Sequence, residues 1–430
     1  MARRLDWWDT YRQTVLVLYR GASDLAAKGV MFVIAVVAAR QLSRDQFGLF
    51  ALASTAGWLG AVAADFGIQV HLARSVSQQP ARAASLLGRW LPVRIGTGVA
   101  ALAVSLLVLR AINFGAEAMW PLLLFTLAYA ATGLTECLYY FFRGLDRTDL
   151  ESTLTLAQRS ALLVLAVGAL WWRPGVTLLG AAMLIPAVAT LAVAALAARR
   201  LAAVQQTAYV LSLPDTRREF FTSVAPIGVG IILSALYFRV DVFLLERWSG
   251  TTQVALYNAV FRLVDGLRLF PAAVLAVALP TLCRASDSGP LRRLAAPLTA
   301  AALGVSVVLW FVAPWLVPAL YGAAYADAAA PLRTLLLALP LMALNYALTH
   351  QLIGWHGHRA YASICGGALS CNLILNWQLI PALGMNGAAW ATVWTEAVLT
   401  SGCIIALVQR MPIVPVTSAP TARPPLEAGP

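Results

Sequence analysis

The chain is built from apolar segments that are each long enough to cross a lipid bilayer. A transmembrane helix needs about 20 mostly apolar residues, and such segments recur along all 430 residues. We expect twelve spans, at 14–39, 47–72, 87–109, 118–142, 154–172, 176–198, 221–245, 254–282, 294–316, 331–353, 361–379 and 385–408. Because lipid offers no hydrogen-bond partners to the backbone, segments of this kind fold as helices. The sequence therefore predicts an all-α membrane protein.

Composition and charge support this class and predict an orientation. Hydrophobic residues make up 60% of the chain and charged residues 12%, against about 45–50% and about 25% in soluble domains. The net charge of +12 comes mainly from arginines in alternate loops, including Arg199–Arg200, Arg217–Arg218 and Arg292–Arg293. The positive-inside rule places these loops, and both termini, in the cytoplasm. The preference for arginine over lysine is typical of a GC-rich bacterial genome, so we expect a multi-pass protein of the bacterial cytoplasmic (inner) membrane.

The longest polar connection divides six expected spans from six. We expect an N-terminal bundle at 1–198, a cytoplasmic linker at 199–220, a C-terminal bundle at 221–410 and a disordered cytoplasmic tail at 411–430, which is rich in Pro, Ala and Thr. The halves share weak similarity at an offset of 207 residues, which aligns Arg40–Gln46 with Arg247–Gln253. Parallel repeats of this kind place a substrate site between the halves, near the middle of the membrane.

Charged side chains occur where bilayer hydrocarbon is expected. A charge at the centre of a membrane helix costs at least about 2.5–3.5 kcal/mol, so such residues usually face a protein interior or a water-filled cavity. On the eighth span, Asn258, Arg262, Asp265 and Arg268 fall within about 120° of one another along about 15 Å of helix. Arg262 and Asp265 either neutralise each other at i,i+3 or line a cavity. The additional Arg268 favours a cationic cavity, and hence a transporter of an anionic substrate.

Other charged residues in the spans allow two interpretations each. Arg239 and Asp241 point about 200° apart on the seventh span, so they cannot face the same surface, and Arg239 could extend to the interface instead. Lys28 lies near the middle of the first span, where it either pairs with Asp24 at i,i+4 or contacts substrate.

Four further charges are deep enough to matter. Arg94 and Glu396 lack local partners, whereas Asp65 and Glu136 lie closer to cytoplasmic ends, where pairing with loop arginines favours a structural role. The substrate-binding candidates are thus Arg262, Arg268, Arg239, Lys28, Arg94 and Asn258. The candidates for coupling to a proton or sodium ion are Asp265, Asp241, Asp65 and Glu396.

No motif indicates an enzyme, a metal site or a cofactor. The chain contains no nucleophile motif, P-loop or dinucleotide fingerprint. The five cysteines lack metal-ligand spacing, and His356 and His358 have only two other histidines in the chain to accompany them. No basic soluble module exists that would bind nucleic acid. We therefore expect neither catalysis, cofactor, metal nor nucleic-acid partner.

Several segments, taken in order, resemble a known family. ARQLSRDQFGLFAL (Ala39–Leu52), YFRVDVFLLE (Tyr237–Glu246), ALYNAVFRLVDGL (Ala255–Leu267) and NLILNWQLIPALGMNGAAWAT (Asn372–Thr392) are similar to bacterial polysaccharide-biosynthesis flippases of the Wzx type. The resemblance covers both halves of the chain. It implies membership of the multidrug/oligosaccharidyl-lipid/polysaccharide exporter superfamily, with two six-helix bundles around a central cavity.

The resemblance also implies a substrate and site residues. Flippases of this branch move undecaprenyl-diphosphate-linked oligosaccharides to the periplasmic leaflet for cell-surface polysaccharide, such as lipopolysaccharide, and work beside a polymerase and other assembly proteins. Arg239 with Asp241, and Arg262 with Asp265, occupy the positions of the family's FRxD and YNxxxRLV patterns, and Lys28 stands where related flippases often carry a basic residue. A diphosphate is the anion that buried arginines suit.

Three alternatives remain open, one of which is a scaffold that only positions a biosynthetic complex. A multidrug exporter of the same superfamily would handle cations, and we expect its cavity to be acidic. A membrane-embedded glycan-assembly enzyme, either a ligase or a glycosyltransferase, would need large periplasmic loops with catalytic carboxylates, whereas every expected outer loop is short.

Overall fold

The computed structural model of the chain describes residues 2–111, 116–204, 216–271, 274–275, 289–355 and 357–410. Regular structure within these ranges is helical, and eleven of the described helical segments are long and apolar enough to cross a membrane. The predicted fold class is thus confirmed. The expected tail at 411–430 and most of the expected linker, 205–215, lie outside the described residues.

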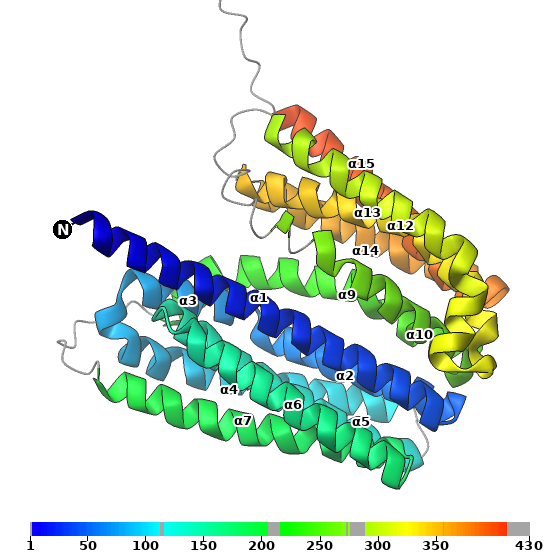
Figure 1. Cartoon of the computed structure of the whole chain (residues 1–430), viewed down its shortest axis with the longest axis horizontal. Coiled ribbons are helices and arrows are strands. Elements are labelled where there is room, and N and C mark those ends of the chain that lie inside the picture. The colour runs from blue at the N-terminus through cyan, green and yellow to red at the C-terminus, as the bar shows by residue number, and fades with distance from the viewer. Residues whose placement is uncertain are drawn as a thin grey trace, which may run out of the picture.

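The helices form two sets that lie side by side (Figure 1). The first bundle comprises α1 (Ala2–Gln41), α2 (Arg44–Asp65), α3 (Ile68–Gln78), η1 (Pro80–Arg82), α4 (Ala83–Ala111), α5 (Ala116–Gly144), α6 (Thr148–Trp172) and α7 (Val176–Val204). A short α8 (Thr216–Glu219) and a π-helical turn, η2 (Phe220–Val224), precede the second bundle. That bundle comprises α9 (Ala225–Ser249), α10 (Thr251–Leu267), α12 (Gly289–Tyr321), η3 (Ala323–Ala328), α13 (Ala329–Gly354), α14 (His358–Leu383) and α15 (Met385–Arg410).

The expected second span is interrupted, which corrects the prediction of a continuous helix over 47–72. α2 ends at Asp65, because Phe66 and Gly67 both adopt positive φ angles of 47° and 82°. Asp65 then accepts hydrogen bonds from the backbone N–H groups of Gly67 (3.2 Å) and Gln69 (3.0 Å), which stabilises the start of α3. The break lies against α9, where a Cβ atom on Gly228 would be only 2.4 Å from the carbonyl oxygen of Phe66. The break between α2 and α3 is therefore a point at which α9 packs closely against the backbone.

The expected eighth span is also shorter than predicted in the described residues. α10 has 17 residues, which corresponds to about 26 Å of helix, and it is not among the eleven candidate spans. It ends where Arg268 forms the C-cap, and Pro271 follows. The rest of the expected span at 254–282 lies mostly outside the described residues.

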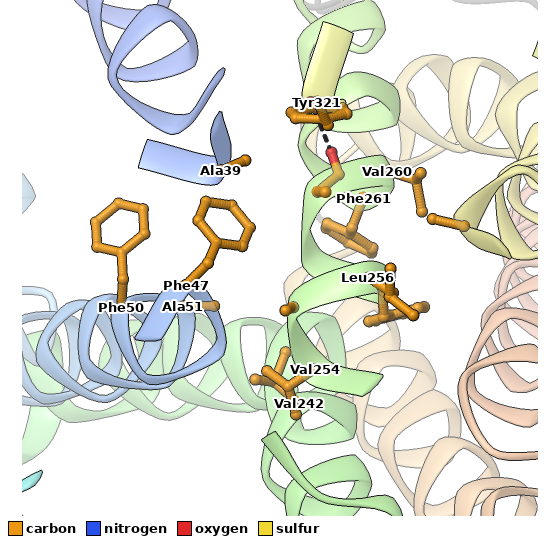
Figure 2. Close-up of a cluster of buried hydrophobic side chains, with 14 of the residues drawn as sticks. Ala39, Phe47, Phe50, Ala51, Val242, Val254, Leu256, Val260, Phe261 and Tyr321 are labelled. Carbon is orange, nitrogen blue, oxygen red and sulfur yellow. Dashed lines mark hydrogen bonds between the residues drawn. The ribbon is translucent and has the colours of Figure 1, made fainter. Parts of the chain in front are cut away.

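A large apolar core joins the two bundles. Phe47, Phe50 and Ala51 of α2 approach Val254 and Phe261 of α10 (Figure 2). The hydroxyl of Tyr321, at the end of α12, donates a hydrogen bond of 2.9 Å to the carbonyl of Ala259, shown as a dashed line (Figure 2). Between helices that cross a bilayer, van der Waals packing of such side chains, rather than removal of apolar surface from water, is the main attraction.

Polar contacts between the bundles gather at the end of the molecule where α1 finishes and α2 begins, and where the two sets of helices converge (Figure 1). Arg40 of α1 donates to the carbonyl of Leu320 (2.8 Å) and to that of Ala319, both at the end of α12. Thr252 of α10 donates to Asp45 of α2 at 2.5 Å. We call these contacts, together with the edge-to-face pair of Phe47 and Tyr325, the end clamp. Asp45 and Thr252 are 207 positions apart, which is the offset of the internal repeat.

Candidate functional site

A cavity of about 880 Å³ lies between the bundles and is the main candidate site. Its walls come from α1, α3, α5 and α6 of the first bundle and from α10 of the second. A volume of this size is at the upper end of the range for ligand pockets. It is therefore large enough for a charged headgroup with attached sugars.

Eight charged side chains line this cavity, in equal numbers of each sign. The basic residues are Lys28, Arg143, Arg159 and Arg262, and the acidic residues are Asp24, Glu136, Glu151 and Asp265. The excess of basic residues that the sequence predicts is therefore absent from the formal count of the lining. The charge available to a ligand therefore depends on which of these side chains already form ion pairs.

Three of the four carboxylates already have an arginine partner. Glu151 accepts a two-point hydrogen bond from Arg143, in which Nε to Oε2 measures 2.7 Å, and Arg20 also lies 3.9 Å away. Arg20 lies 4.0 Å from Asp24 as well. Asp265 lies 3.7 Å from Arg268, so its partner is not Arg262. The sequence hypotheses of an Arg262–Asp265 pair and of an Asp24–Lys28 pair therefore do not describe the contacts in the structure.

The remaining lining charges, Lys28, Arg159, Arg262 and Glu136, make no ion pair within the described residues. Lys28 and Glu136 are exposed to the cavity. Arg159 and Arg262 each keep a buried Nε that has no hydrogen-bond partner in the described residues. The guanidinium of Arg262 lies 5.1 Å from the centre of the Phe50 ring.

The expected polar stripe on the eighth span divides between two environments. Arg262 and Asp265 line the cavity. Asn258 is fully buried, and its Oδ1 accepts a 3.1 Å hydrogen bond from Arg239 of α9. The guanidinium of Arg268 is 4.3 Å from the ring centre of Phe238 and 15% exposed, inside the second bundle. Neither Asn258 nor Arg268 is among the lining residues.

Arg239 and Asp241 point to different neighbours, as their spacing predicts. Arg239 is directed toward α2 and α10 and lies over the ring of Phe261, with its Cζ 4.7 Å from the ring centre. Asp241 is 2% exposed and accepts a 2.5 Å hydrogen bond from the hydroxyl of Tyr257, which also contacts Thr392 at 3.3 Å. Asp241 therefore belongs to the interior of the second bundle.

Glu396 lies in a second buried polar group of the same bundle. It is 2% exposed, and its carboxylate accepts hydrogen bonds from Nδ2 of Asn345 (2.7 Å) and from the hydroxyl of Tyr237 (3.1 Å). Thr400 in turn donates to Asn345 at 2.8 Å. A carboxylate with several donors at this depth is well satisfied.

Arg94 and Asp65 lie inside the first bundle, away from the cavity lining. Arg94 is 1% exposed, and its Nε and Nη2 have no hydrogen-bond partner among the described residues. It borders a pocket of about 150 Å³ with walls of small side chains such as Gly57, Gly60 and Ala61. Asp65 stabilises the start of α3, as described above.

Sequence reasoning missed the wall formed by α5 and α6. Arg143 and Arg159 belong to this wall, although their place near cytoplasmic loops makes them resemble ordinary positive-inside arginines. Glu136 also faces the cavity, whereas its distance from the middle of the membrane indicates a structural ion pair. The wall also carries uncharged groups that suit sugars, namely Thr132, Thr135, Tyr139, Tyr140, Thr155 and Gln158. A helical spacing of four between Thr132, Glu136 and Tyr140 is the signal that would have placed them on one face.

Comparison with known proteins places the chain in a family. Residues 16–286 match the family described as polysaccharide biosynthesis protein. No curated protein matches the chain.

Solved structures share the fold. The lipid II flippase MurJ in an inward closed conformation has a TM-score of 0.65 at 12% identity, covering 92% of this chain and 89% of that one. The inward-facing form of a multidrug resistance MATE family transporter of the MOP superfamily has a TM-score of 0.60 at 15% identity, covering 92% and 94%. The MATE transporter VcmN of Vibrio cholerae has a TM-score of 0.58 at 15% identity, covering 93% and 95%.

Proposed function

Because the chain belongs to the polysaccharide biosynthesis protein family, we propose that it is a flippase for a polyprenyl-diphosphate-linked oligosaccharide, undecaprenyl being the lipid, in the bacterial inner membrane. The diphosphate docks in the cavity between the bundles, the sugars lie along the α5–α6 wall, and the lipid stays in the bilayer. The bundles then rock about the site, which is how transporters with parallel repeats alternate access. The product is substrate for cell-surface polysaccharide assembly, and a polymerase is an expected partner.

The observation that carries this proposal is the pattern of unpaired charge. Once the ion pairs of Glu151, Asp24 and Asp265 are set aside, the lining retains Lys28, Arg159 and Arg262 against the single carboxylate of Glu136. The usable charge is therefore positive, although the formal count is balanced. Guanidinium groups with free N–H donors suit the oxygens of a diphosphate, and each such hydrogen bond contributes about 1.5–3 kcal/mol.

The geometry also links binding to movement. Lys28 and Arg159 come from the first bundle, whereas Arg262 comes from the second. A dianion held by all three bridges the bundles, so its affinity depends on how far apart they stand. A ligand shifts a conformational equilibrium only when it contacts the two states differently, and this arrangement meets that condition.

The other charged residues that the sequence identified have roles in ion coupling or in positioning α10. Asp265 faces the cavity, whereas Asp241 and Glu396 lie within the second bundle and are the candidates there for a coupling proton or sodium ion. Asp65, inside the first bundle, completes the set of candidate coupling carboxylates. Arg239 contacts Asn258 and Arg268 contacts Asp265, on either side of Arg262 along α10, and both would hold Arg262 in position. We place both termini, and the end of the cavity at Arg143, on the cytoplasmic side of the membrane, as the positive-inside rule predicts.

The test is flipping in proteoliposomes that contain a lipid-diphosphate-linked oligosaccharide whose sugars are detected from outside by a lectin. We expect Lys28→Gln, Arg159→Gln and Arg262→Gln each to lower the flipping rate at subsaturating substrate about 10- to 150-fold, since each removes about 1.5–3 kcal/mol of substrate binding. Arg173→Gln is the matched control, because Arg173 is exposed beyond the end of α6. Wild-type rates in all three cavity variants would refute the site.

A second function is favoured by one observation, the unpaired Glu136 carboxylate in the cavity. An exporter of organic cations would use it, and the MATE transporters share the fold. Efflux of a cationic dye that depends on Glu136 but not on Arg262, with no flipping of the glycolipid, would establish that alternative. No observation in the cavity favours a glycan-assembly ligase or glycosyltransferase.

A further inference from the structure

Glu136 differs from the other carboxylates of the cavity. Asp24, Glu151 and Asp265 each lie within 4.0 Å of an arginine nitrogen. Glu136, in the last third of α5, faces the cavity and has no ion-pair partner at that distance in the described part of the chain. An arginine at ion-pair distance stabilises the ionised form of a carboxylate, and Glu136 has no such partner within 4.0 Å among the described residues. Glu136 is therefore the cavity carboxylate best placed to change its charge.

Charged groups on several of the helices packed against α5 surround Glu136. The groups that interact with it electrostatically are Arg159 on α6, Arg94 on α4, Asp65 at the end of α2 and Arg143 on its own helix. Arg143 is committed to Glu151, and Asp65 to the start of α3. On other walls of the same cavity are Lys28 on α1 and both Arg262 and Asp265 on α10.

Arg159 is the group that Glu136 shares with a substrate. Both residues line the cavity, and the Nε of Arg159 has no partner in the described residues. When Glu136 is ionised, it attracts Arg159 and repels any anion that approaches it. When Glu136 carries a proton, that repulsion ends and the guanidinium is free for a phosphate oxygen.

We propose that Glu136 is an internal competitor for the substrate diphosphate, so that the diphosphate binds together with one proton, which is taken up on the Glu136 carboxylate. This inference rests on the proposed function, because it assumes a diphosphate at Arg159. The step is a simple proton transfer from solvent to carboxylate, with no other bond made or broken. Loss of that proton restores the repulsion and lowers the affinity of the site for the anion.

The test is calorimetric titration of the full-length protein in lipid nanodiscs. The probe is a diphosphate diester that joins a short isoprenoid to N-acetylglucosamine, because a diester has no group that titrates near neutral pH. Titration in two buffers with different ionisation enthalpies gives the number of protons taken up on binding. We expect uptake for the wild type, and a Kd that rises with pH by up to about tenfold per pH unit, the limit for linkage to one proton.

Glu136→Gln removes the titrating group and keeps the shape of the side chain. We expect it to bind the probe with no proton uptake, at a pH-independent Kd close to that of the wild type at low pH. Glu136→Asp should restore the uptake, which separates a titrating role from a merely structural one. Asp24→Asn is the matched control, because Asp24 lines the same cavity but already has Arg20 as its partner, and it should keep the wild-type uptake.

The outcomes separate the two proposals. Binding by the wild type without proton uptake, or undiminished uptake by Glu136→Gln, overturns the role of Glu136 and leaves the flippase site intact. Binding that survives in Lys28→Gln and Arg262→Gln with unchanged Kd overturns the diphosphate site itself. An absence of probe binding by the wild type at every pH overturns both.

Discussion

Gly48 on α2 provides the sharpest test of how the bundles separate. A Cβ atom at this position would lie 2.1 Å from the carbonyl oxygen of Thr251 and 2.7 Å from its Cγ2 atom. Thr251 begins α10 in the other bundle, and the contacting atom is backbone, so Gly48→Ala requires the helices to move apart. Overpacking of this kind costs typically about 1–3 kcal/mol. Because the clash exists only while the end clamp is closed, the cost falls on that state alone.

A cost of about 1–3 kcal/mol on one state shifts a two-state equilibrium about 5- to 150-fold. The assay is a distance measurement between spin labels at Arg173 and Leu383, which lie at the ends of α6 and α14 in different bundles. We expect Gly48→Ala to populate a longer distance. Gly304→Ala on α12 is the matched control, because a Cβ atom there meets nothing within 4 Å.

Thermal unfolding of the same variants distinguishes two responses to the Gly48→Ala clash. Either the bundles move apart and remain folded, or the whole protein is destabilised. A longer distance with a nearly unchanged unfolding midpoint means that the bundles part as rigid bodies. An unchanged distance distribution, together with wild-type flipping, would show that the α2–α10 contact is not part of the moving interface, and the reasoning would be refuted.

Three further substitutions follow from individual contacts. Arg40→Gln removes a charged donor from the carbonyls that end α12, so we expect the same labels to show more of the longer distance, at a cost of no more than about 1.5–3 kcal/mol; no change would mean that this contact contributes nothing to closure. Tyr257→Phe leaves Asp241 without its 2.5 Å donor, and we expect a loss of about 1–3 kcal/mol in unfolding free energy, measured by denaturant titration in detergent, whereas an unchanged midpoint would contradict it. Asn345→Ala removes a donor from buried Glu396 and should cost a similar amount, with Glu396→Gln in the same background recovering part of the loss because a neutral side chain needs fewer donors.

The sequence predicts the membrane class, because apolar length and charge are properties that each segment carries alone. It also identifies Lys28, Arg262 and Asp265 as cavity residues, since a lone charge in hydrocarbon demands an explanation. The break at Phe66 was missed although Gly67, with its φ of 82°, is a local helix-stop signal, because the long apolar run concealed it; the close packing of α9 against the break could not be predicted from the segment alone. Whether other residues face the cavity depends on how whole helices rotate against one another, which no single segment specifies.

Charge pairing was the other feature beyond the reach of sequence spacing. Arg262 and Asp265 are three residues apart, yet Asp265 lies closest to Arg268, also three residues away on the other side. Spacing allows both pairs equally, so it could not choose between them. Arg143 and Arg159 were hidden for a different reason, since arginines near cytoplasmic helix ends are expected in any membrane protein.

The hydrogen bond between Thr252 and Asp45 constrains how the two halves can differ. Residues 207 positions apart occupy equivalent places in the two repeats, and these two meet each other. A chain with identical halves would bring two aspartates, or two threonines, face to face at this point. Two aspartates at hydrogen-bonding distance repel each other, whereas an aspartate and a threonine supply one acceptor and one donor. Two equivalent positions that contact each other must therefore carry different, complementary residues. At this position the two halves share a fold but cannot share a sequence.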